Sequence, residues 1–166
     1  MPLFDSLYNF AMWLARNREE AEDLVQETYA KALKGFSSFQ PGTNFRAWMF
    51  RILRNAFLNS RTGLKVSQTD YLDLEIHSQL MPVTEHTPES ILLRQIDHET
   101  LYRAIEELPV VFREVLILRD VEEMNYQEIA EAVSVPMGTV MSRLSRVRRL
   151  LRNMLQERGK ESNHVL

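Results

Sequence analysis

The side chains whose type and spacing point most clearly to chemistry are the arginines near the end of the chain. Residues 143–152 hold five arginines and no acid, whereas residues 126–133 hold two carboxylates and no base. Guanidinium groups bond to guanine edges and to phosphate oxygens, so a helix that carries a row of them suits DNA recognition. A Val-Pro-Met-Gly segment lies between the two parts. A short helix, a tight turn and a second helix together predict a helix-turn-helix.

The apolar residues of the second helix predict which of its side chains face outward. Val140, Leu144, Val147, Leu151 and Met154 recur at steps of four and three and form its inner stripe. A helical wheel then places serines and arginines outward and further arginines on the flanks, where they would neutralise phosphates. A plain solvated helix face remains the alternative. The candidates for this contact are Thr139, Ser142, Arg143, Ser145, Arg146, Arg148 and Arg149.

A second basic set follows the polar loop FSSFQPGTN. Thr43 or Asn44 can cap a helix whose apolar face includes Phe45 and Trp48, and we interpret Trp48 as a core residue. Cations opposite that face suit contacts to phosphates and to single-stranded DNA. The candidates here are Arg51, Arg54 and Arg61, with Arg46 and Asn55 on the flanks.

A third set is acidic and lies on an earlier predicted helix, which Asn17 and Glu20 would cap. Asp23 and Glu27 are one helical turn apart and Gln26 is adjacent, so they can form an edge that binds arginines of a partner helix. A solvated helix face explains each of them individually as well.

Composition narrows the classes of protein. The chain has 166 residues, of which 45% are hydrophobic and 26% charged, which is typical of a globular protein. It has no cysteine, and its four histidines share no ligand-like spacing. We therefore expect no catalytic residue, metal or cofactor. With no long apolar run and no signal-peptide pattern, we expect a cytoplasmic protein without membrane insertion.

Charge and periodicity together predict the organisation. The net charge is −3, but residues 97–131 hold ten acids and three bases, while residues 138–160 hold seven bases and one acid. Apolar residues recur at helical spacing except in a polar, proline-containing stretch. We expect an all-α fold of two small helical domains, 1–62 and 91–160, joined by a flexible linker, 63–90, and followed by a tail, 161–166. The two domains should move relative to each other.

The sequence resembles one family in particular. YQEIAEAVSVPMGTVMSRLSRVRRLL resembles the last DNA-binding region of extracytoplasmic-function sigma factors, the small two-domain initiation factors of bacterial RNA polymerase. AEDLVQETYAKALKGFSSF and NFRAWMFRILRNAFLNSR resemble the family's second region, and ELPVVFREVLILRDVEEMNYQEIAE resembles the segment before the reading helix. These blocks occur in the family's order and cover roughly two thirds of the chain.

The resemblance implies roles for the three sets. Asp23, Gln26 and Glu27 would grip a coiled coil in the largest polymerase subunit. The loop before the third helix would capture a base flipped from the minus-ten element, with Asn44 as our choice for the base contact. The basic residues of that helix would bind minus-ten DNA, and the helix-turn-helix would bind the minus-thirty-five element. Met141 stands where several relatives carry a base-reading arginine, so the preferred minus-thirty-five sequence stays open.

The implied partners are core RNA polymerase, promoter DNA and an anti-sigma factor, under whose control the chain would direct transcription of stress-response genes. Two alternatives remain. A conventional helix-turn-helix regulator would have no use for the AEDLVQE motif. A sigma mimic that sequesters an anti-sigma factor would have no use for an intact basic reading face.

Overall fold

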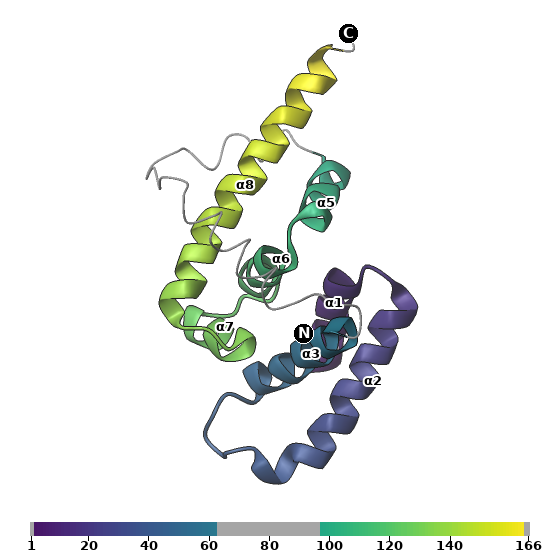
Figure 1. The fold of residues 1–166 in the computed structure, drawn as a ribbon, viewed down its shortest axis with the longest axis vertical. Coiled ribbons are helices and arrows are strands. Elements are labelled where there is room, and N and C mark those ends of the chain that lie inside the picture. The colour runs from purple at the N-terminus through teal and green to yellow at the C-terminus, as the bar shows by residue number, and fades with distance from the viewer. Residues whose placement is uncertain (1, 63–96, 165–166) are drawn as a thin grey trace.

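The chain folds into two groups of helices, which a computed structural model of the protein shows in Figure 1. The structure describes residues 2–62 and 97–164, and every regular element within them is helical. The expected all-α fold is therefore confirmed. No helix in these ranges combines the length and the apolar character needed to cross a membrane. The predicted linker, 63–90, and the predicted start of the second domain lie outside the described residues.

The first group contains α1 (Leu3–Ala15), α2 (Arg18–Gly35) and α3 (Phe45–Thr62), with a 3-10 turn, η1 (Phe36–Ser38), after α2. The second group contains α5 (His98–Glu107), α6 (Val110–Leu116), α7 (Tyr126–Val133) and α8 (Met137–His164), with a π-helical segment, η2 (Ile117–Val121), after α6. In Figure 1, α8 runs along one edge of the molecule, and α1, α2 and α3 gather on the other side.

Side-chain caps begin several of these helices, and those of α2 and α3 lie where the sequence predicts them. The Asn17 side chain accepts a hydrogen bond from the Glu20 backbone N–H at 3.0 Å. At the start of α3, Asn44 Oδ1 accepts from the Ala47 N–H at 2.8 Å. Asp97 caps α5, and the hydrogen bond from the Thr100 backbone lowers the pKa of its carboxyl. Each cap satisfies a backbone donor that has no partner inside its helix.

The helix-turn-helix forms as predicted. Asn125 and Glu128 form a reciprocal capping box at the start of α7, with both hydrogen bonds at 2.8 Å. Ser134 ends α7 with a φ of 56°, and its N–H bonds to the Ala130 carbonyl. This left-handed residue turns the chain sharply, so that α8 begins three residues later.

The buried faces of the helices are largely those that the apolar spacing predicts. Leu7, Phe10 and Leu14 of α1 are fully or almost fully buried. Helix α3 differs in part: Phe50 is fully buried and lies 5.3 Å from Phe10 between ring centroids, whereas Phe45 is 41% exposed. The reason is that α3 packs against both α1 and α2, so its buried face is wider than a single stripe.

The two groups of helices are docked on each other. Helix α3 packs against α7, and α1 packs against α6. The Trp13 and Tyr102 rings lie 4.6 Å apart, and the Arg113 guanidinium donates to the Leu14 carbonyl at 3.4 Å. Buried apolar side chains from both groups form one continuous cluster. In this structure the two groups therefore share one core, and the expectation that they move relative to each other stays a prediction.

Candidate nucleic-acid interface

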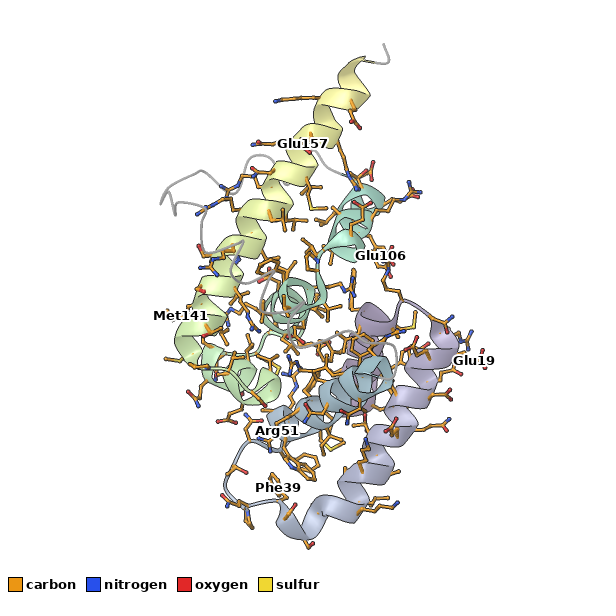
Figure 2. All side chains as sticks on the ribbon, in the orientation of Figure 1. Glu19, Phe39, Arg51, Glu106, Met141 and Glu157 are labelled. Carbon is orange, nitrogen blue, oxygen red and sulfur yellow. The ribbon has the colours of Figure 1, made fainter. Side chains whose placement is uncertain are left out.

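The basic side of α8 carries most of the residues that the sequence singles out for base and phosphate contacts. Ser145 is exposed, and Thr139, Ser142, Arg146 and Arg149 are half-buried. Met141 is 49% exposed, and Figure 2 shows it on the outer side of α8, away from the first group of helices. This side can therefore meet a DNA groove.

Arg148 and Arg143 flank this side in different ways. Arg148 pairs with Asp120 at 3.3 Å, and the two side chains are 38% and 49% exposed, so the pair contributes little to stability. Arg143 is buried, contrary to the expected position on an open flank. Its guanidinium lies 3.9 Å from the Glu114 carboxylate, which is itself 1% exposed. A buried carboxylate requires a nearby cation, and this requirement accounts for the inward orientation of Arg143.

Arg54 is the most deeply engaged of the candidates on α3. Its Nε and Nη2 donate to the two Glu114 oxygens at 2.7 and 3.1 Å, and its side chain is 13% exposed. Such a bidentate pair is strong and geometrically specific. We expected Arg54 on a solvated face, and this placement is wrong because the second group of helices covers that face.

Two further candidates bond across the same interface. Arg46 donates to the Glu122 carboxylate at 2.8 Å and to the Glu122 carbonyl at 2.9 Å. Asn44 donates through Nδ2 to Glu128 at 2.8 Å while its oxygen caps α3. Asn44 therefore fills both roles available to an amide, since its oxygen accepts and its nitrogen donates.

The remaining candidates on α3 lie outside this interface. Arg51 and Asn55 are exposed. Arg61 pairs with Glu20 at 2.7 Å and lies over the Phe57 ring at 5.0 Å. Arg61 is thus held against the first group of helices, whereas Arg51 can reach a ligand.

A cavity of about 350 Å³ lies beside the start of α3. Phe39, Asn44, Trp48 and Arg51 line it from the first group of helices, and Glu131 of α7 lines it from the second. Figure 2 shows Phe39 and Arg51 at this end of the molecule. The Phe39 and Trp48 rings lie 5.0 Å apart. Such a site offers aromatic faces, an amide and a cation, which together suit a planar polar group such as a base.

The position of Trp48 modifies our interpretation of it as a core residue. It is only half-buried: it packs against the core while it also lines the cavity. The apolar spacing of α3 indicates the first of these roles. The second role depends on the segment between α2 and α3, which places the Phe39 ring 5.0 Å from that of Trp48.

The predicted acidic edge of α2 is formed and accessible. Asp23, Gln26 and Glu27 are all exposed, while Leu24 and Val25 between them are buried. Glu27 pairs with Lys31 at 2.7 Å. The edge thus presents carboxylates and an amide to solvent on the side away from the core.

Sequence reasoning missed the carboxylates that face α3. Glu114, Glu122, Glu128 and Glu131 come from α6, α7 and the segment between them. The sequence indicates only that this region is acidic, because residues 97–131 hold ten acids and three bases. The spacing of residues along the chain could not show that these acids lie opposite arginines of α3, which are distant in sequence.

Comparison with known protein families finds two matches within the chain. Residues 3–65 match sigma-70 region 2, and residues 98–151 match sigma-70 region 4. The first match contains α1, α2 and α3, and the second contains the helix-turn-helix. Both sets of candidate DNA-binding residues therefore lie within matched regions.

Three curated relatives are similar over nearly the whole chain. The ECF RNA polymerase sigma factor SigE of Mycolicibacterium smegmatis is 33% identical over 95% of this chain, which spans 60% of that relative's length. The RNA polymerase sigma factor YlaC of Bacillus subtilis is 32% identical, with 95% of this chain and 91% of the relative covered. The ECF sigma factor EcfG of Rhodopseudomonas palustris is 33% identical, with 97% and 91% covered.

Two solved structures have a similar fold. The sigma factor RpoE of Bartonella quintana, in complex with the anti-sigma factor NepR, matches with a TM-score of 0.66 and 29% identity, covering 93% of this chain and 92% of that one. CnrH in complex with the cytosolic domain of CnrY matches with a TM-score of 0.62 over 92% of this chain and 81% of that one. CnrH is 22% identical, so it supports the fold alone.

Proposed function

Because this chain belongs to the extracytoplasmic-function sigma factors of bacterial RNA polymerase, we propose that it binds core polymerase and directs it to promoters. The main support for this proposal is that one chain matches both sigma-70 region 2 and sigma-70 region 4. Each matched region contains its own set of arginines. In this function the protein is an adaptor, and the chemistry of RNA synthesis belongs to the polymerase.

The proposal assigns each surface a partner. The exposed edge of Asp23, Gln26 and Glu27 binds core polymerase, where its carboxylates meet basic side chains. The outer side of α8 enters the major groove of the minus-thirty-five element, with arginines bonding to base edges and phosphates.

The start of α3 binds the minus-ten element. Arg51 and Asn55 are exposed and can contact its backbone directly, whereas Arg46, Arg54 and Arg61 must leave their carboxylate partners to do so. A base that leaves the duplex enters the cavity beside Phe39, Asn44 and Trp48. Flipping a base costs a few kcal/mol, and a preformed pocket that stacks and bonds it can offset that cost.

An anti-sigma factor is the proposed regulator. The structure of RpoE, similar over most of this chain, is a complex with an anti-sigma factor. Exposed apolar side chains on the first group of helices, among them Leu33 at 80% and Phe36 at 60%, offer contact area to such a partner.

The test is transcription by sigma-free bacterial core polymerase on a library of randomised promoter DNA. The purified chain should select a defined pair of promoter elements. Asp23→Arg should lower both core binding and transcription at least tenfold, because it replaces attraction with repulsion. Asp5→Arg is the matched control, since it reverses an exposed acid on α1 outside the edge.

Equal core binding by the wild-type chain and the folded Asp23→Arg variant would contradict the polymerase-binding edge. Absence of any selected promoter, with core binding intact, would contradict the sigma-factor function itself.

A further inference from the structure

Two exposed methionines lie at the start of α8, the helix proposed above to enter the minus-thirty-five groove. Met137 and Met141 are 46% and 49% exposed, whereas Met49 and Met124 are almost fully buried. The two exposed residues are four positions apart, so their side chains are neighbours on the helix surface. Figure 2 shows Met141 on the outer side of α8, away from the first group of helices. Packing in the core therefore does not explain these two apolar side chains.

Gly138 lies between these methionines in sequence and is a neighbour of Met141 on the same surface. It is exposed, its φ is not positive, and a Cβ at this position would meet no packed neighbour within 4 Å among the described residues. Neither the backbone nor the packing requires a glycine here, although glycine weakens a helix relative to alanine. A glycine does allow a partner to approach the helix backbone closely. The start of α8 is therefore suited to close contact with another molecule.

The charges of the helix-turn-helix begin only after this apolar surface. Residues 134–142 hold no charged side chain, whereas residues 143–152 hold five arginines. In helix-turn-helix proteins the N-terminal residues of the second helix contact base edges, and contacts to phosphates fix its position on the duplex. An uncharged start followed by arginines therefore fits a helix whose first turns lie deepest in the groove.

A methionine side chain matches one feature of the major groove best. Its thioether donates no hydrogen bond, so a methionine placed against guanine would leave the O6 and N7 acceptors of that base without partners. Thymine is the base that presents an apolar group in this groove, the methyl group on C5. The unbranched and flexible side chain of methionine can adapt to the shape of that methyl group.

We propose that Met141, with Met137 beside it, reads the methyl group of a thymine in the minus-thirty-five element. At this position α8 then specifies a T·A pair, whereas an arginine would specify guanine. Gly138 lets the base edges approach the helix, and the arginines that follow position it on the phosphates. This inference rests on the proposed function, because it assumes that α8 enters the groove of promoter DNA.

The experiment removes the methyl group from the DNA and the thioether from the protein, separately and together. Each thymine of the selected minus-thirty-five element is replaced in turn by deoxyuridine, which differs from thymidine only in lacking the C5 methyl. The protein is the full-length chain assembled with core polymerase, as wild type, Met141→Ala or Met141→Leu. Leu150→Ala is the control, because Leu150 is an apolar residue of the same helix that is 36% exposed and lies outside its first turns.

Fluorescence anisotropy measures the affinity of each complex for each DNA. At one thymine, the exchange should weaken binding of the wild type about fourfold, the effect expected for one methyl group that is no longer buried. Met141→Ala should bind the thymine and uracil forms of that DNA equally, because the side chain that covers the methyl group is absent. Met141→Leu keeps an apolar side chain and should still distinguish the two forms. Leu150→Ala should show the full difference of the wild type.

A dependence on the methyl group that persists in Met141→Ala would assign the contact to another residue and overturn the inference. A selected element in which no thymine methyl affects wild-type binding would overturn it as well. Both results leave the sigma-factor function intact, because a promoter is still selected. Absence of any selected promoter, although circular dichroism shows the chain to be helical, would contradict the proposed function and this inference with it.

Discussion

At the scale of single residues, Arg146 and Arg149 lie on the same side of α8 and suit different contacts. Both are half-buried, and the helical wheel directs both outward, to the side that we propose enters the DNA groove. Arg146 is the residue that we expect to read a base. Arg146→Ala should cost about 1–3 kcal/mol on the selected minus-thirty-five element, and the loss should shrink when the contacted base pair is changed. Binding of the full-length chain to single-base-pair variants of that element measures both effects.

Arg149→Ala is the comparison for this prediction. A phosphate contact carries no base information, so this variant should weaken binding about equally on every sequence and make the salt dependence shallower. If Arg146→Ala also weakens all sequences equally, Arg146 belongs to the electrostatic contact and some other residue reads the base.

At the scale of elements, α7 depends on its cap. It has eight residues, and helices this short are not stable alone in water. Asn125 and Glu128 satisfy two backbone donors at its start. Asn125→Ala should therefore lower the free energy of unfolding by about 1 kcal/mol, measured by urea denaturation. Asn125→Asp keeps an accepting oxygen and should retain most of the stability. A loss of equal size in both variants would mean that the cap is not the source.

At the scale of the whole molecule, docking depends on a buried charge pair. Arg54→Ala removes a cation from Glu114, whose side chain is 1% exposed. Removing one partner of a buried pair typically costs about 3–5 kcal/mol, and the nearby Arg143 places the expected loss at the low end, about 3 kcal/mol. Urea denaturation of the full-length chain measures it.

Arg51→Ala is the matched control, since Arg51 lies one turn away on α3 and is exposed. It should change the free energy of unfolding by less than about 0.5 kcal/mol. If the two variants are equally stable, the Arg54 pair does not hold the two groups of helices together.

The sequence by itself determined the helices, their caps and most of their buried faces. These features depend on residues a few positions apart: Asn17 caps a backbone donor three residues on, and Leu7 and Phe10 share a face because of the helical repeat. The acidic edge of α2 and the outer side of α8 could be predicted for the same reason. Their binding roles follow from the family and stay predictions.

Only the tertiary structure decided which charges lie together. Arg54 and Glu114 are 60 positions apart, and Asn44 and Glu128 are 84 apart, so no local pattern relates them. The sequence shows a basic helix and an acidic segment, and each could equally have faced solvent. Docking the two groups of helices on one core brings these charges within hydrogen-bond distance. In a buried interface of low dielectric, a carboxylate must then be paired with a cation, which is why arginines predicted to face DNA turn toward the protein's own acids.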